Sequence, residues 1–172
     1  MNKEFLQAID DWLYEFLLKT KPIMPTRIAK WIALYYTDAR VRKAYSDIIG
    51  VKMGEGTYAN IGLSVIPLGK GEHVNIGKNV SIGPNATFIA DSGANNSPEL
   101  NKMPYVRDKL TKYAPIVVDD EVWIGANVTI LPGIHIGRCS VIGAGSVVTK
   151  DVMPYTIIAG VPAREIQRLT KE

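Results

Sequence analysis

The chain has 172 residues, of which 47% are hydrophobic and 22% charged, a balance that is typical of a globular domain and not of a disordered segment. Its formal net charge of +3 is too small to indicate nucleic-acid binding, and no basic stripe interleaved with aromatic residues supports that role. The apolar stretches are too short or too often interrupted by charge to span a membrane, and residues 1–4 lack a signal-peptide pattern, so we expect a cytoplasmic protein.

Two helices are predicted at the start of the chain. From residue 2 to about residue 19, apolar residues recur at steps of three and four and share one helical face: Phe5, Ile9, Trp12, Leu13, Phe16 and Leu17. After two prolines, Thr26 is a candidate N-cap for a second helix that runs to about Ile48, with the apolar stripe Ile28, Trp31, Ile32 and Tyr35. We interpret residues 1–50 as a helical cap over the first coil of the region that follows, because that coil would otherwise expose unpaired strand edges.

A six-residue repeat dominates the rest of the chain. Over residues 53–71 the spacing is irregular, which we interpret as opening coils in poor register. Beyond them an aliphatic or aromatic residue recurs every six positions: Ile76, Ile82, Phe88, Val118, Ile124, Ile130, Ile136, Ile142 and Val148. The fifth place of most hexads holds a small or apolar residue: Val80, Ala86, Val122, Val128, Ser140 and Ser146. The repeat predicts a mainly β domain over residues 51–160, a parallel β-helix in which each hexad supplies one strand and one corner.

Two segments depart from the repeat. Residues 89–115 form a loop rich in Asn, Pro, Lys and Glu, and a loop of this length without its own pattern is usually functional or disordered. Because the repeat resumes in phase at Ile116, we expect an excursion that covers a site or a neighbouring subunit. Residues 161–172 are predicted to form a short helical tail.

Cys139 is the only cysteine, which excludes an internal disulfide and a thiolate metal cluster. Its place in the hexad that begins at Ile136 is a corner, so we expect a structural role for it rather than a nucleophilic one.

The repeat region resembles the hexapeptide-repeat acyltransferases, in particular the branch of maltose, galactoside and capsular-sugar O-acetyltransferases. The resemblance is carried by PIVVDDEVWIGANVTILPGIHIGRCSVIGAGSVVTKDVMPYTIIAGVPAREI, from Pro115 to Ile166, and by VNIGKNVSIGPNATF, from Val74 to Phe88. It implies a left-handed β-helix and a homotrimer with active sites at the subunit interfaces. It also implies acetyl-CoA as the donor co-substrate and a sugar or another small hydroxyl or amine as the acceptor, and we expect no metal.

The family pattern also assigns a groove for coenzyme A along the later coils. The residues that match the pantetheine stretch are Trp123, Gly125, Ala126, Gly143, Ala144, Thr149 and Lys150, and those that match its distal end are Ala159, Gly160, Pro162 and Arg164. Small residues let the backbone approach a thin chain, and Lys150 and Arg164 can pair with phosphates. Gly125, Gly143 and Ala144 are equally expected from the corners of any β-helix, so the basic pair is more informative.

Acetyl transfer needs a base, donors for the carbonyl oxyanion and an oriented acceptor. Enzymes of this family usually place a histidine in the extended loop, and residues 89–115 contain none. We therefore consider His73, just before the regular coils, and Asp91, where the chain leaves the wall, as candidate catalytic residues. His135 lies in the outward sixth place of its hexad and is expected to be solvated or a subunit contact.

Candidates can also be named for the oxyanion donors and for the residues that bind the acceptor. Backbone N–H groups near Gly125 or Gly143 are candidate oxyanion donors, and the candidate acceptor ligands are Asn85, Asn95 and Asn96. An acetyltransferase in which the acceptor attacks acetyl-CoA directly in a ternary complex is the favoured function. A CoA-binding or scaffold trimer without turnover is the alternative, since the usual loop histidine is absent. A zinc-dependent hydratase on a similar β-helix would need three histidines converging from two subunits, and the chain has two.

Overall fold

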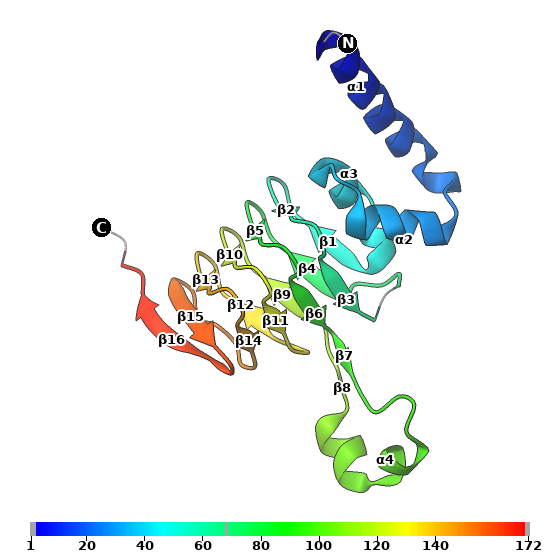
Figure 1. Ribbon diagram of the computed structural model, residues 1–172. Helices are drawn as coiled ribbons and strands as arrows, with labels where there is room; N and C mark the ends of the chain where they lie inside the picture. The colour runs from blue at the N-terminus through cyan, green and yellow to red at the C-terminus, as the bar shows by residue number, and fades with distance from the viewer. Residues whose placement is uncertain (1–2, 68, 171–172) are drawn as a thin grey trace.

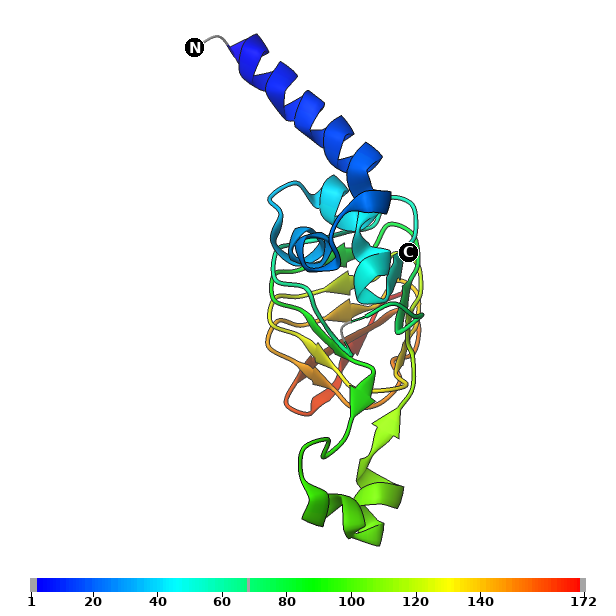
Figure 2. The ribbon, with the colours of Figure 1, turned by 90° about the vertical axis from the view of Figure 1, so that its right-hand side faces the viewer.

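The computed structural model describes residues 3–67 and 69–170, so residue 2 of the predicted first helix and the last two residues of the predicted tail lie outside the described residues. The body is a column of stacked coils, each built from short parallel strands joined by corners (Figure 1). Helices lie at one end of the column, and one long excursion leaves it sideways (Figures 1 and 2).

The strands of the column form three walls. The first wall contains β1 (Val51–Met53), β4 (Val74–Ile76), β9 (Ile116–Val118) and β12 (His135–Ile136). The second wall contains β2 (Tyr58–Ala59), β5 (Ser81–Ile82), β10 (Trp123–Ile124), β13 (Val141–Ile142) and β15 (Thr156–Gly160). The third wall contains β3 (Ser64–Ile66), β6 (Thr87–Ile89), β11 (Thr129–Ile130) and β14 (Val147–Val148). All strand pairs within these walls are parallel.

The inward positions of the hexads form one continuous core. Ile124 lies between Ile82 and Ile142 on the second wall, and Ile130 lies beside Phe88 on the third. These five side chains are at most 2% exposed. The side chains in the fifth place are buried as well: Val80, Ala86, Val122, Val128, Ser140 and Ser146. The prediction of a mainly β, parallel β-helix is therefore confirmed, with stacked coils that share one apolar interior.

The first coil is in register with the second, which corrects the expectation of poor register near its start. Three residues keep the six-residue spacing and pair with the next coil: Met53 with Ile76, Ala59 with Ile82, and Val65 with Phe88. The spacing is hard to see in the sequence because Ala59 is small. In addition, the connection from β3 to β4 is longer than the other corners of the first two coils, which shifts the phase of the repeat.

The coils bend at residues in the left-handed backbone region. Asn79, Asn85, Asn127 and Cys139 have φ angles of 54° to 57°, and Asn is the residue other than Gly that adopts this conformation most readily. Side chains also link the corners of successive coils, since the Asn85 amide Nδ2 donates to Asn127 Oδ1 at 3.3 Å. Cys139 occupies a corner, as its place in the repeat predicts.

Short helices cover the first coil: α2 (Thr26–Tyr35), α3 (Ala39–Ala44) and the 3-10 helix η2 (Ser46–Ile49), which follow the 3-10 turn η1 (Lys21–Ile23). The guanidinium of Arg42 on α3 donates from Nη2 to the carbonyl oxygen of Ala59 at 2.7 Å. The predicted second helix is thus divided, because the chain turns after Tyr36 and restarts at Asp38, whose carboxylate caps α3. Pro25, and not Thr26, holds the N-cap position of α2.

The first helix, α1 (Lys3–Thr20), does not cover the coil, which corrects that part of the predicted cap. It projects away from the column (Figures 1 and 2), and Leu17 is its one buried residue. Its C-terminal end is held by the Tyr45 hydroxyl, which donates to the carbonyl oxygen of Leu17 at 2.6 Å. None of the described helices is both long enough and apolar enough to cross a membrane.

The excursion leaves the wall as expected and has secondary structure of its own. Its base is an antiparallel ribbon of β7 (Asp91–Ser92) and β8 (Lys112–Tyr113), and its tip carries α4 (Pro98–Lys102) and the π-helical turn η3 (Val106–Leu110) (Figure 2). Where the excursion joins the column, which we call the neck, the N–H of Ala114 donates to the carbonyl oxygen of Ala90 at 2.9 Å. Strand β4 pairs directly with β9, so the excursion does not interrupt the first wall.

The C-terminal segment is a β-hairpin, which corrects the predicted helical tail. Strand β16 (Ala163–Arg168) pairs antiparallel with β15 at the end of the second wall. The physical reason is the open edge of β15, whose backbone groups find partners when the chain folds back on it.

Candidate active site

His73 is fixed at the start of the second coil, where the excursion also returns to the column. Its backbone N–H donates to the carbonyl oxygen of Gly50 at 3.1 Å, and its own carbonyl oxygen accepts the N–H of Ile116 at 3.0 Å. The imidazole is buried and lies edge-on to the ring of Tyr113, with the ring centroids 6.1 Å apart. His73 Nδ1 and the Tyr113 hydroxyl are 3.1 Å apart, within hydrogen-bond distance.

Asp91 lies directly opposite Tyr113 in the ribbon at the base of the excursion. Directly opposed residues of an antiparallel pair place their side chains on the same face. Asp91 is half-buried, whereas Tyr113 is 63% exposed. The structure therefore places both predicted catalytic residues beside Tyr113: His73 contacts its side chain, and Asp91 is its partner in the backbone register of the ribbon.

Tyr113 was missed by reasoning from the sequence. The sequence did contain one signal. Residue 91 comes shortly after the strand β6, residue 113 comes shortly before the strand β9, and the repeat predicts both strands. Because the excursion leaves and rejoins the column at adjacent coils, its first and last residues run side by side in opposite directions. This arrangement pairs residue 91 with residue 113. We call His73, Asp91 and Tyr113 the neck cluster.

The neck cluster can hold and move a proton. A neutral imidazole with its proton on Nε2 accepts the Tyr113 hydroxyl at Nδ1, and the phenol oxygen then has lone pairs for a further donor. Because Tyr113 is exposed and His73 is buried, the phenol connects the imidazole to solvent or to a bound molecule. The arrangement suits general acid–base chemistry on a hydroxyl or amine group.

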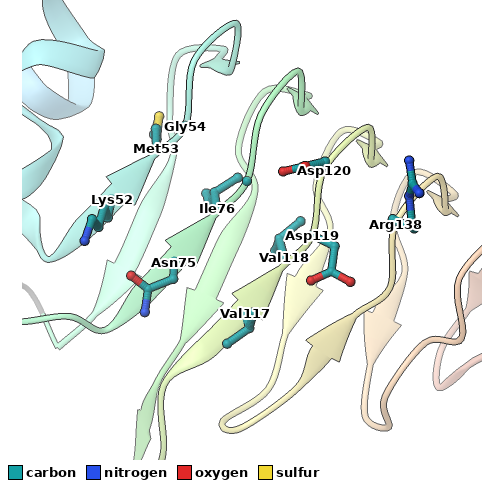
Figure 3. A pocket seen from close by; sticks show the side chains of 11 residues that line it. Lys52, Met53, Gly54, Asn75, Ile76, Val117, Val118, Asp119, Asp120 and Arg138 are labelled. Carbon is teal, nitrogen blue, oxygen red and sulfur yellow. The ribbon is translucent and has the colours of Figure 1, made fainter.

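His135 is outside this cluster. It is exposed on the outer face of the first wall, as predicted, and its Nε2 lies 2.8 Å from Asp119 Oδ1. A groove of about 670 Å³ lies on the same face, and Asn75, Val117 and Asp119 are among its lining residues (Figure 3). None of the predicted site residues lines this groove.

The predicted cofactor residues divide into two groups. Thr149, Lys150 and Arg164 line one cleft of about 180 Å³ beneath the C-terminal hairpin, together with Glu165. Gly160 lies at the turn of that hairpin. The shared cleft places two cationic side chains together, which suits a phosphate-bearing ligand.

The other group lies along the second wall and its corner. Trp123 is exposed on the outer face of β10. Gly125 and Gly143, with Ala126 and Ala144 next to them, follow β10 and β13 where successive coils stack closely. A Cβ atom on Gly125 would lie 2.6 Å from the backbone nitrogen of Ala144, and one on Gly143 would lie 2.8 Å from Ala159 Cβ. The absence of a side chain at both positions is therefore required by the coil itself.

The predicted acceptor ligands are close together in the chain but differ in surroundings. Asn85 is a corner residue whose amide bonds Asn127 of the next coil. Asn95 and Asn96 are exposed in the excursion, on the turn before α4. Among the described residues, no three His, Cys, Asp or Glu side chains lie close enough together to hold a metal ion.

Comparison with known proteins gives one family. Residues 115–150 match the model of the bacterial transferase hexapeptide family (six repeats). The chain is 40% identical to galactoside O-acetyltransferase of Escherichia coli (strain K12) over 119 residues, which are 69% of this chain and 54% of that protein. It is 36% identical to a putative acetyltransferase of Staphylococcus aureus (strain MRSA252) over 151 residues, 79% of this chain and 74% of the relative.

A solved structure agrees with these relatives. The hexapeptide-repeat acetyltransferase of Vibrio cholerae O1 biovar eltor, complexed with acetyl coenzyme A, is 26% identical with a TM-score of 0.59, and the match covers 91% of this chain and 89% of that one. The first curated relatives are matched over 45–58% of their own lengths, so the chain spans about half of each.

Proposed function

The chain belongs to the bacterial hexapeptide-repeat transferases, and we propose that it transfers the acetyl group of acetyl-CoA to a hydroxyl group of a sugar or another small acceptor. The relative from Escherichia coli is named as a galactoside O-acetyltransferase, and the Vibrio cholerae structure holds acetyl coenzyme A. An amine acceptor is the second possibility for the same reaction. The observation that carries the proposal is the neck cluster, because it joins three groups capable of acid–base chemistry at the base of the excursion.

The donor is proposed to lie along the later coils. The cleft of Thr149, Lys150 and Arg164 would receive phosphates of the nucleotide end. Trp123 and the small corner residues Ala126 and Ala144 would lie beside pantetheine. The stacked coils already require Gly125 and Gly143, so these glycines say little about a ligand. Lys150 and Arg164 are therefore the residues of this groove that best support CoA binding.

In the proposed reaction, the acceptor oxygen attacks the thioester carbonyl within a ternary complex. A C–O bond forms, the C–S bond breaks, and the hydroxyl proton passes to the Tyr113 oxygen while the phenol proton moves to His73 Nδ1. The imidazolium then returns a proton by the same route to the departing thiolate. Asp91, which pairs with Tyr113 in the register of the ribbon, is proposed as a second group that assists proton removal. The N–H groups of Gly125 and Gly143 already donate to the carbonyl oxygens of Ile142 and Ile158. The proposed oxyanion donors are therefore other backbone N–H groups near these two glycines.

Further features are inferred from the family. They are the left-handed winding of the coils and a closed trimer with sites between subunits. Asn95 and Asn96 are proposed to contact the acceptor from the exposed turn of the excursion. For Asn85 the link to Asn127 gives a structural role in addition to the proposed contact with the acceptor.

The test measures release of free thiol from acetyl-CoA against a panel of sugars, amino acids and amines. Tyr113→Phe, His73→Gln and Asp91→Asn are compared with His135→Gln, a matched control for loss of a histidine outside the neck cluster. Loss of a general base typically lowers the rate by about 10²- to 10⁴-fold, and we expect this for Tyr113→Phe and His73→Gln. Full turnover in both variants would exclude the neck cluster as the base.

A second measurement separates the enzyme from the CoA-binding scaffold. Calorimetric titration of CoA is compared with titration of pantetheine, which lacks the nucleotide. We expect Lys150→Ala to weaken CoA binding without affecting pantetheine. If wild-type protein binds CoA and no acceptor in the panel releases thiol, the scaffold function is supported instead.

A further inference from the structure

Helix α1 is oriented with its polar side toward the body of the protein. Gln7, Asp10 and Tyr14 on α1 line a cleft with residues of the loop between α2 and α3. The guanidinium of Arg40 lies over the ring of Tyr14, 4.5 Å from its centroid. A surface helix of a globular protein normally turns its apolar face to the core, so α1 shows the reverse orientation.

The opposite side of α1 is an exposed apolar stripe. It consists of Phe5, Leu6, Ile9, Trp12 and Phe16, and we call it the α1 stripe. Trp12 is 63% exposed, and its ring stacks on that of Phe16 with the centroids 5.4 Å apart. Contiguous exposed apolar surface of this kind marks an interaction site.

A second exposed stripe lies on α2, which we call the α2 stripe: Ile28, Trp31 and Tyr35, with Ile23 just before the helix. The other side of α2 is already used, since Ala29, Ile32 and Ala33 belong to the buried core. Figure 1 shows α1 pointing away from α2 and the column, so the two stripes of one chain do not cover each other.

The charges of the two helices are complementary. Helix α1 carries four acidic residues, Glu4, Asp10, Asp11 and Glu15, against the two basic residues Lys3 and Lys19. Helix α2 carries Arg27 and Lys30 and no acidic residue. Opposite net charges favour the pairing of α1 with α2 and disfavour the pairing of α1 with another α1. They also disfavour an anionic membrane, because helices that lie on such surfaces carry Lys and Arg on their polar face.

We propose that the α1 stripe of one copy of this chain lies along the α2 stripe of a second copy. This pairing covers both apolar surfaces with one contact and places the acidic helix beside the basic one. It is a contact between two different surfaces of the same chain, and such contacts close into a ring when the rotation between copies allows it.

The experiment uses the full chain with its natural cysteine replaced (Cys139→Ser). Cysteines are introduced at Ile9 in the α1 stripe and Trp31 in the α2 stripe, and the double variant is treated with a short bismaleimide cross-linker. We expect a covalent product of two or more chains on a denaturing gel. Gln7→Cys with Trp31→Cys is the matched control, because Gln7 faces the body of its own chain, and we expect at least about a tenfold lower yield from it.

Three outcomes would overturn the proposal. Equal cross-linking by Ile9→Cys alone would indicate that two α1 helices pair with each other. A product linked only within one chain would indicate that α1 folds back on its own α2. Flotation of the wild-type protein with vesicles of phosphatidylglycerol and phosphatidylcholine, lost in Trp12→Asp, would assign the α1 stripe to a lipid surface. Circular dichroism of each variant confirms that the column has folded, since every substituted position in the helices is exposed.

Discussion

Replacing Gly125 with alanine tests whether the small corner residues serve the fold or the ligand. The added Cβ would lie 2.6 Å from the nitrogen and 2.8 Å from the Cα atom of Ala144. Both are backbone atoms of the next coil and cannot rotate away, so the coils have to separate locally. Overpacking of this kind costs about 1–3 kcal/mol, and contact with backbone places Gly125→Ala near the upper end of that range. At roughly 2–4 °C for each kcal/mol, the midpoint of thermal unfolding falls by roughly 6–12 °C.

The assay pairs thermal unfolding, followed by circular dichroism, with CoA titration at a temperature where the variant is folded. Gly69→Ala is the control, because no atom lies within 4 Å of its added Cβ, and its stability should change by less than about 0.5 kcal/mol. The reasoning predicts that Gly125→Ala loses stability and that its folded form still binds CoA. A Gly125→Ala variant that is as stable as wild type but no longer binds CoA would refute this reasoning. It would show that the ligand, and not the neighbouring coil, requires glycine at this position.

Three further predictions concern the rest of the fold. Arg42→Met should lower the free energy of unfolding by about 3 kcal/mol, because the buried guanidinium donates to the carbonyl oxygens of Tyr36, Thr37 and Ala59. Urea denaturation measures this loss, and the exposed Arg40→Met is the control that should lose clearly less. Phe88→Ala should cost about 3–5 kcal/mol in the same assay, and a loss below about 1 kcal/mol would show that the core is not continuous at the third wall. The hydrogen bond from Arg40 lowers the pKa of Asp38 below its ordinary value of 3.8, so its carboxylate stabilises the fold above pH 3.8, and this contribution is lost as the pH falls through the pKa of the folded state. The stability difference between wild type and Asp38→Ala should therefore shrink on acidification below pH 3.8, and a constant difference down to pH 2 would contradict the assignment.

The column could be predicted because every coil repeats the same short sequence pattern. An inward apolar residue and a corner recur each six positions, so Ile124, Ile130 and Ile142 were placed correctly without knowledge of any distant contact. The first coil escaped notice because its inward position at Ala59 holds a small residue, although the six-residue spacing from Met53 to Ala59 to Val65 is kept.

What could not be predicted depends on contacts between distant segments. The hairpin of β15 and β16 forms because a sheet edge is available, and the sequence of β16 does not reveal that edge. The position of Tyr113 beside His73 depends on the pairing of β7 with β8 across the whole excursion. The orientation of α1 depends on its surroundings, because its apolar spacing predicts a helix and one face but not what that face contacts.

The neck between Ala90 and Ala114 separates the excursion from the folding of the column. Since the two adjoining coils pair as though nothing were inserted between them, changes in the length or content of the intervening segment leave the apolar interior intact, and lengthening such a loop adds little entropic cost. Replacement of residues 93–110 in libraries would therefore test the proposed contact of the excursion with the acceptor while the column is left unchanged.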